Sequence, residues 1–270
     1  MGGNTIPEFD VAVVGAGPAG LVAGLAAATR GLSVAVIGPI APADARTSAL
    51  MEPVIRELTR LGIWPALQDD SAPLTAIRLI DATETILKAP EVTFRASEIG
   101  LTAFGHNIPN ARLTSELERA VSKVATRIPA AVVSAETATQ GVTLHLSNGA
   151  TIKANVIAAA DGRRSLMREH AGIALDHWSY DQSAVITTFA HDRRHHGIST
   201  EFHRSAGPLT VVPCPGQTSS LVWVETSAEA SRLQSLDDTS FRRVLERHLL
   251  GLLGPIRDLT PRHVFPLSGQ

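Results

Sequence analysis

Residues 10–20 read DVAVVGAGPAG, an apolar run that breaks into glycine and resumes as a helix-forming segment. Gly15, Gly17 and Gly20 stand in G-x-G-x-x-G spacing near the N-terminus. In this arrangement the first glycine allows a tight turn, the second lets the backbone approach a pyrophosphate, and the third lets helix and strand pack closely. The amides at the start of the helix add a positive end for the phosphates. The stretch predicts a strand–turn–helix unit that binds a dinucleotide.

The rest of the N-terminal half continues an α/β pattern. Short β-branched runs predict strands, and apolar residues three and four apart predict helices. Strands are expected at Val11–Val14, Ser33–Ile37, Val142–Leu146 and Thr151–Ala158, and helices at Pro18–Thr29, Ser48–Leu61 and from Asn110, taken as an N-cap, to about Val124. Asn148-Gly149, between the last two strands, predicts a hairpin turn.

After about His177 the sequence becomes rich in short strands. Runs at Ala184–Phe189, Leu209–Val212 and Ser220–Val224 are separated by SAGP and PCPGQ, which predicts an antiparallel sheet with short connections. Ile77–Ile80 is expected to add a further strand, and Phe241–Leu253 to form a helix.

Composition narrows the function classes. A net charge of −2 argues against a nucleic-acid surface. The single cysteine, Cys214, excludes an internal disulfide, and between two prolines it is best interpreted as a turn-edge thiol. Residues 11–28 are apolar, but four glycines and a proline interrupt them, so neither a transmembrane span nor a signal peptide is expected. Of 10 histidines, four lie in His191–His203, whose spacing matches no standard metal site; a solvated, partly basic loop is the interpretation preferred over metal binding.

The residue that would bind the ribose of a nicotinamide dinucleotide is missing. An acid is expected at the end of the second strand, about 20 residues after the glycine turn. Gly38 stands there, and the nearest acid is Asp44 in the following loop. The missing acid argues against NAD as the ligand, whereas the nearby Arg46 means that NADP is not excluded.

A later stretch changes the interpretation. Residues 156–172 read VIAAADGRRSLMREHAG, an apolar strand followed by Asp161-Gly162, basic residues and a helix. With the glycine turn, this stretch resembles the FAD-dependent aromatic hydroxylases, the single-component flavoprotein monooxygenases. A plain turn is the alternative for Asp161-Gly162, since this pair is common in turns. DARTSALM (44–51) resembles the family's arginine loop, and NIPNARLTSEL (107–117) the segment whose amide side chain reaches the flavin. WSYDQSAV, AGPLTVVP and SLVWVE are similar to the hydroxylases of ubiquinone biosynthesis.

The resemblance implies a fold and a set of cofactor contacts. The fold is α/β, a Rossmann-like FAD-binding domain of the GR2-type flavoprotein fold with a second, antiparallel β-sheet substrate lobe. Residues 1–72 and 104–176 would form the FAD-binding domain, and 73–103 and 177–270 the substrate lobe. The implied FAD contacts are Gly15, Gly17, Ala19, Gly20, Arg46, Thr47, Asn110, Asp161 and Gly162.

The resemblance also implies a reaction. NAD(P)H would reduce FAD, and O2 would then hydroxylate an aromatic ring, here a polyprenylated phenol of ubiquinone biosynthesis. Tyr180 or His106 could act as a base toward a phenol, but nothing in the spacing favours one over the other, so no catalytic residue is assigned. The expected location is cytoplasmic, with peripheral association at the inner membrane face or with a biosynthetic complex left open, as is the oligomeric state.

The resemblance implies more sequence than is present here. The family continues past the segment matching VFPLSGQ into a Gly-Asp motif that holds the ribityl chain and pyrophosphate, and into a helix beneath the flavin ring. We therefore expect the C-terminal FAD-binding segment to be absent, and this chain to retain little FAD. An NADP-dependent dehydrogenase and a non-catalytic fragment are the alternative functions.

Overall fold

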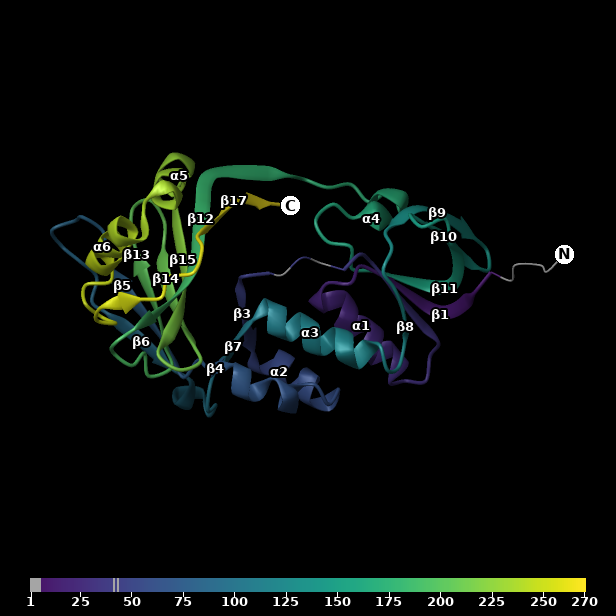
Figure 1. Ribbon diagram of the computed structural model, residues 1–270, viewed down its shortest axis with the longest axis horizontal. Coiled ribbons are helices and arrows are strands. Elements are labelled where there is room, and N and C mark those ends of the chain that lie inside the picture. The colour runs from purple at the N-terminus through teal and green to yellow at the C-terminus, as the bar shows by residue number, and fades with distance from the viewer. Residues whose placement is uncertain (1–5, 41, 43) are drawn as a thin grey trace.

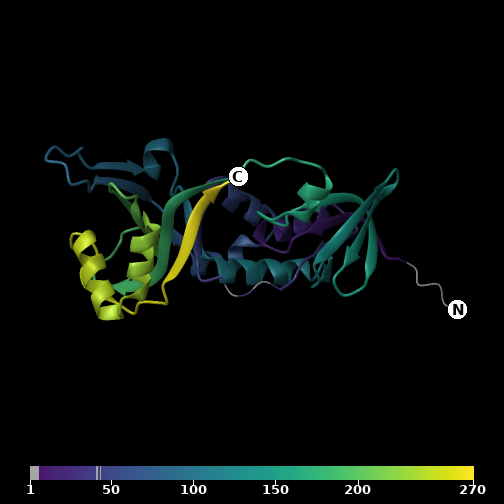
Figure 2. The same cartoon turned by 90° about the horizontal axis from the view of Figure 1, so that it is seen from above.

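Two lobes lie along the long axis of the molecule in the computed structural model, which describes residues 6–40, 42 and 44–270 (Figures 1 and 2). Within these residues, the first lobe carries a six-stranded sheet and four helices. The second carries an eight-stranded sheet with two helices on its outer side. The first five residues, and positions 41 and 43, of the predicted FAD-binding domain lie outside the described residues.

The sheet of the first lobe has the strand order β8-β2-β1-β11-β10-β9. The first four strands are parallel, and the last two extend the sheet antiparallel. In chain order the strands are β1 (Glu8–Val14), β2 (Val34–Ile37), β8 (Thr126–Ile128), β9 (Val132–Ala138), β10 (Gly141–Leu146) and β11 (Thr151–Ala159). Gly149 donates its amide to Leu146 in the turn between β10 and β11, which confirms the hairpin predicted at Asn148-Gly149.

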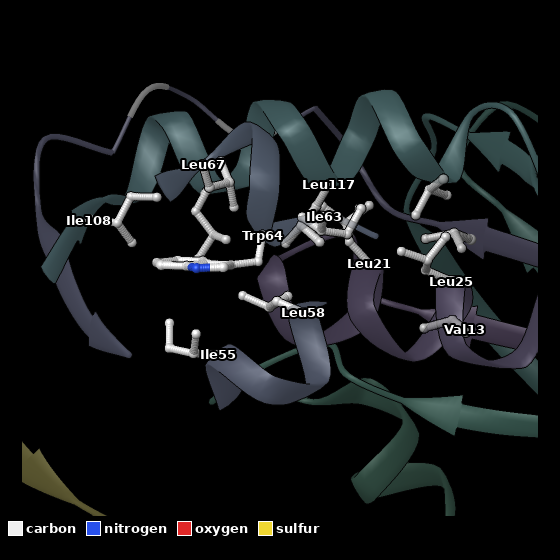
Figure 3. Packing of buried hydrophobic residues seen from close by; sticks show 14 of the residues in the cluster. Val13, Leu21, Leu25, Ile55, Leu58, Ile63, Trp64, Leu67, Ile108 and Leu117 are labelled. Atoms are coloured by element: carbon white, nitrogen blue, oxygen red, sulfur yellow. The ribbon is translucent and has the colours of Figure 1, made fainter. Parts of the chain in front are cut away.

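The helices of the first lobe are α1 (Pro18–Ala28), α2 (Glu52–Arg60), α3 (Asn110–Val121) and α4 (Leu166–His170). One continuous core joins the first three to the sheet. Its largest member, Trp64, lies among Ile55, Leu58 and Leu67 (Figure 3). Short 3-10 turns cover Trp64–Ala66, Gln68–Asp70 and Ala96–Ile99, and the first of these contributes Trp64 to the core.

Two predicted helix starts are wrong. The helix expected from Ser48 begins at Glu52, because 47–51 form β3 (Thr47–Met51), which pairs with β7 (Gly105–Pro109). With β4 (Ala72–Pro73) these strands make a small third sheet. Asn110 is the first residue of α3 and not its N-cap; Pro109 holds the cap position in extended conformation.

The sheet of the second lobe has the order β16-β12-β15-β14-β13-β5-β6, with β17 also paired to β12. Its strands are β5 (Ala76–Asp81), β6 (Val92–Arg95), β12 (Trp178–His191), β13 (Ile198–His203), β14 (Leu209–Cys214), β15 (Thr218–Thr226), β16 (Ile256–Arg257) and β17 (His263–Gly269). The expected antiparallel pairing holds except between β5 and β13, which run parallel. The domain boundaries at 72/73, 103/104 and 176/177 stay a prediction.

Helices α5 (Ser227–Ser235) and α6 (Asp238–His248) cover one face of this sheet. The helix predicted over 241–253 ends early, because Leu250 and Gly251 take left-handed conformations after His248. Leu253 still reaches the core from the following turn.

The histidine-rich segment is not a uniformly solvated loop. His191 is buried at the end of β12, and residues 198–203 form β13, because a β strand inserts there between β14 and β5. Cys214 is the last residue of β14 and buried, and burial raises the pKa of its thiol to about 11. Among the described residues, no three metal-ligating side chains come together. No helix in the described part of the chain has the length and apolar character needed to span a bilayer.

Candidate functional site

The glycine turn connects the carboxyl end of β1 to α1 and touches the end of β11. Gly15 has φ +114°, and a Cβ there would lie 2.1 Å from the carbonyl oxygen of Ala160. A Cβ on Gly20 would lie 1.9 Å from the carbonyl oxygen of Gly15, so helix and turn are in backbone contact. At Gly17, in contrast, a Cβ would meet nothing within 4 Å. Gly15 and Gly20 therefore pack tightly against backbone, whereas Gly17 faces open space.

The start of α1 leaves backbone donors beside that space. Leu21 donates the first intrahelical hydrogen bond, to Gly17, and Pro18 has no N–H. The amides of Ala19 and Gly20 therefore precede the helical ladder and are free to bind an anion.

A second turn follows β11. Asp161 lies at its start, and Gly162 has φ +81°, where a Cβ would meet nothing within 4 Å. One carboxylate oxygen of Asp161 accepts from the Ser165 hydroxyl, and the other accepts from the Met167 amide at 3.1 Å. Ser165 in turn caps α4. The Asp161 carboxylate thus organises the start of α4, as the plain-turn alternative expects, and a contact with a ligand stays a prediction.

The two turns border one cavity of about 690 Å³ at the carboxyl ends of β1, β2 and β11. This is where open α/β sheets bind their ligands. Gly15, Gly17, Asp161 and Gly162 line it together, and Ala131, Val132, Pro39 and Ile40 give it an apolar end.

Gly38 at the end of β2 also lines this cavity. A Cβ at Gly38 would lie 2.7 Å from the Ala16 nitrogen, so an acidic side chain would require this backbone to move. Arg127 donates to the Gly38 carbonyl at 2.7 Å while paired with Glu118. The sequence offered no signal for Arg127, because β8 joins the sheet beside β2 only in the folded chain.

The arginine loop has its own hydrogen-bond network. Arg46 binds Asp44 through two nitrogens, at 2.8 and 2.7 Å, and these bonds hold the pKa of Asp44 well below its usual range. Asn110 donates to Asp44 at 2.9 Å and accepts from Ser48 at 2.6 Å. Thr47 begins β3 opposite Pro109. The structure brings Arg46 and Asn110 together, as predicted for two residues of one site. Because Arg46 is already bound to Asp44, it is less free to bind the 2′-phosphate of NADP.

The second lobe meets both loops through β17. The Arg46 guanidinium lies over the Phe265 ring, 5.2 Å from its centroid. Arg163, next to Gly162, donates to the hydroxyl of Ser268. Figure 1 shows β17 on the side of the second lobe that faces the first. Neither contact has a local sequence signal, because each joins a loop of the first lobe to the last strand of the chain.

The face of the eight-stranded sheet that carries Phe265 has a partly exposed apolar strip, bordered on the same face by polar residues such as His263 and Thr210. Register pairing places Phe265 beside Ala184 and, two residues along β12, Ile186 beside Val222. Ile186 and Val222 are intermediate in exposure, and Phe265 is 36% exposed. Helices α5 and α6 cover the opposite face. The open face offers an apolar wall next to the arginine loop.

The two candidate bases lie in different surroundings. His106 packs against the Trp64 ring and contacts the Ser71 hydroxyl at 3.0 Å, and burial lowers its pKa. Tyr180, near the start of β12, is 54% exposed and accepts a hydrogen bond from Trp178. His106 therefore packs at the edge of the first lobe's core, and the geometry assigns a catalytic role to neither His106 nor Tyr180.

Comparison with protein families decides the classification. The family described as "FAD binding domain" matches residues 8–255, nearly the whole chain. The chain belongs to this family. Ubiquinone hydroxylase UbiL of Rhodospirillum rubrum is 34% identical over 99% of this chain, and 3-demethoxyubiquinol 3-hydroxylase of Escherichia coli is 27% identical over 96%. The chain spans 64% of the length of the first and 68% of the second.

Solved structures agree on the fold. The structure of PqsL, a probable FAD-dependent monooxygenase from Pseudomonas aeruginosa, has a TM-score of 0.79 and 16% identity, covering 96% of this chain and 73% of that one. The predicted α/β fold with a Rossmann-like FAD-binding domain and a second sheet-rich lobe is confirmed.

The cavity of this FAD-binding-domain chain fits a dinucleotide in three respects. The space at Gly17 is open, the amides of Ala19 and Gly20 follow Gly17 at the start of α1 ahead of the helical ladder, and the carboxyl ends of three parallel strands converge there. Ala19 itself lines a neighbouring cavity of about 810 Å³, which shares Ala160, Asp161 and Gly162 with the first. The family assignment supports FAD as the dinucleotide. Gly38, which stands where an acid is expected, concerns only the part of the cavity that would bind the ribose.

Proposed function

We propose that this chain forms the N-terminal cofactor site and the substrate wall of an FAD-dependent monooxygenase that hydroxylates an aromatic ring with NAD(P)H and O2. The observation that carries the proposal is the cavity between the glycine turn and the Asp161-Gly162 turn, in a chain of the FAD-binding-domain family. The names of the two relatives, both hydroxylases of ubiquinone compounds, support the reaction class.

The residues expected to contact FAD, of which Gly17 lines the cavity, have separable roles in this proposal. Bound FAD supplies the electron transfer from NAD(P)H to O2. The amides of Ala19 and Gly20 would bind its pyrophosphate, which Gly17 admits because it has no side chain. Arg46 and Asn110, fixed by Asp44, would contact the flavin from the arginine loop.

The open sheet face supports a lipophilic phenol as substrate. Ile186, Val222 and Phe265 form an apolar wall that would exclude water from a bound aromatic ring. A polyprenylated phenol of ubiquinone biosynthesis matches both this wall and the names of the relatives.

Peripheral association with a membrane is part of the proposal, because such a substrate partitions into lipid. The tip of the β5–β6 hairpin carries Ile86 and Leu87, which are 100% and 90% exposed, followed by Lys88. Two apolar side chains beside a cation are typical of shallow contact with a bilayer. A nucleic-acid partner is not proposed, given the net charge of −2.

Because little FAD retention is expected of this chain, the experiment first establishes FAD binding and then incubates the flavin-bearing protein with NADH or NADPH, a prenylated phenol and isotopically labelled O2. Mass spectrometry should find one labelled oxygen atom on the aromatic ring. Gly17→Val should abolish the labelled product, while Gly17→Ala, whose small Cβ meets nothing, retains more of it. FAD binding without any labelled product would contradict the monooxygenase, and reduced nicotinamide turnover without flavin would favour the dehydrogenase alternative.

A further inference from the structure

The second lobe contains a cavity of its own, on the helix-covered face of the eight-stranded sheet. Thr200 on β13 lies opposite Arg78 on β5 and Val211 on β14 in the sheet register. All three line a cavity of about 440 Å³, which is also lined by Arg193 and Arg194 and, beyond α6, by Leu252 and Leu253. Phe202, two residues along β13 from Thr200, is in the core beneath the helices, which fixes the face. This arginine cavity therefore opens away from the face that meets the first lobe.

Polar side chains form part of the floor of the arginine cavity. Thr200 and Ser219 are 2% and 1% exposed, although their neighbours on this face belong to the hydrophobic core. His191 binds the carbonyl oxygen of Arg193 through Nδ1 at 2.8 Å, so its Nε2 accepts from the Ser219 hydroxyl at 2.9 Å. These bonds fix the backbone from which Arg193 and Arg194 project.

The charge of the cavity is positive. Arg78, Arg193 and Arg194 line it, and among the residues that the structure describes no carboxylate does. His195 and His196 also line it; the His195 ring is held by bonds to the carbonyls of Cys214 and Gly216 through Nε2 and accepts from the Gly197 amide at Nδ1.

Counter-ions from the described part of the chain are few. Glu91 lies 3.3 Å from Nε of Arg78, yet this buried nitrogen has no hydrogen-bond partner among the described residues. Asp192, adjacent in sequence to Arg193, pairs with Arg257 instead. Arg193 donates to the Gly251 carbonyl, at 2.7 Å. The three guanidinium groups thus exceed the described carboxylates that face them.

We propose that the arginine cavity binds a phosphate group carried by a small organic residue. Guanidinium groups match phosphate oxygens in paired, charge-assisted hydrogen bonds, and a dianion offsets the excess charge better than a carboxylate does. Val211, Leu252 and Leu253 provide an apolar wall for the organic part. A free phosphate ester and a phospholipid headgroup share this chemistry.

The test measures binding by calorimetry, without flavin or substrate, so that it is independent of the proposed function. The probes are glycerol 3-phosphate, and vesicles of phosphatidic acid in phosphatidylcholine against phosphatidylcholine alone. Arg193→Gln and Arg194→Gln should each weaken binding about tenfold, the value of one charge-assisted hydrogen bond. Arg243→Gln, an exposed arginine on α6, is the charge-matched control and should bind as the parent does.

The outcomes separate the sources. Arginine-dependent binding of glycerol 3-phosphate identifies a free phosphate ester, and arginine-dependent binding of phosphatidic acid vesicles alone identifies a headgroup; both support the proposal. Because Arg78 is mostly buried, Arg78→Lys, which keeps the charge, is used there and should weaken binding less than Arg194→Gln. Absence of binding to both probes, or binding that Arg193→Gln and Arg194→Gln leave unchanged, overturns it.

Discussion

The two turns that border the flavin cavity are built by opposite means. The Gly15–Gly20 turn is held by backbone against backbone, with no room for a Cβ at either end. The turn at Asp161-Gly162 is held by side chains, because Asp161 accepts from Ser165 and Met167 while Gly162 faces open space. A positive φ occurs in both turns, yet only in the first is it combined with steric closure. The two glycine-containing motifs should therefore respond very differently to substitution.

The largest expected effect is on the closure of the first turn. Gly20→Ala would bring a Cβ to 1.9 Å from the Gly15 carbonyl oxygen, and Gly15→Ala adds a left-handed conformation to a similar clash. Each should lower the free energy of unfolding by about 3 kcal/mol or more, from overpacking and backbone strain. Urea denaturation measures this loss. Gly17→Ala is the matched control and should stay within about 0.5 kcal/mol of the parent; equal losses at all three positions would refute the closure argument.

Gly17 separates folding from binding within the same turn. Gly17→Val should leave the urea midpoint nearly unchanged, because the site is open, but its side chain would occupy the space assigned to pyrophosphate. Loss of two backbone hydrogen bonds predicts FAD affinity reduced by about 100-fold. Titration of the apoprotein with FAD, followed by flavin fluorescence, measures this. Unchanged affinity would mean that the phosphates bind elsewhere.

The second turn should depend on its carboxylate. Asp161→Ala removes the acceptor for the Ser165 hydroxyl and the Met167 amide, so α4 loses its organised start. We expect a loss of about 1–2 kcal/mol in the free energy of unfolding. Asp161→Asn keeps one acceptor oxygen and should lose less. Rapid-mixing measurement of flavin reduction by NAD(P)H adds a second readout: a slower reduction in Asp161→Asn, at little cost in stability, would support a ligand role beyond the cap.

The contrast between the turns also marks what the sequence could predict. The strand, the glycines and the helix of the first turn are contiguous, so their spacing alone predicts the local structure and its ligand class. Asn148-Gly149 is equally local. The sequence pattern misleads where a tertiary partner decides the structure: Leu50 and Met51 fit the apolar face of a helix, but pairing with β7 makes 47–51 a strand.

Contacts between distant segments left no such pattern. Phe265 under Arg46, Ser268 beside Arg163 and Arg127 on the Gly38 carbonyl each join residues that only the folded sheets bring together. Asp161 is different, because its motif is visible in the sequence, but its carboxylate hydrogen-bonds within its own turn and the start of α4. Residue types indicated the cofactor class, and the packing decided which atoms face the cavity.

A smaller loss of stability than at Gly15 is expected at Gly162, and it completes the contrast between the two turns. Both have positive φ, +81° and +114°, but a Cβ on Gly162 meets nothing within 4 Å. Gly162→Ala should therefore show only the cost of a left-handed alanine, about 1 kcal/mol. Gly162→Asn should lose less, since asparagine adopts this conformation more readily. Parallel urea curves for Gly15→Ala and Gly162→Ala measure the difference directly. Losses of equal size would show that conformation dominates at both turns, and that contact with the Ala160 carbonyl adds nothing at the first.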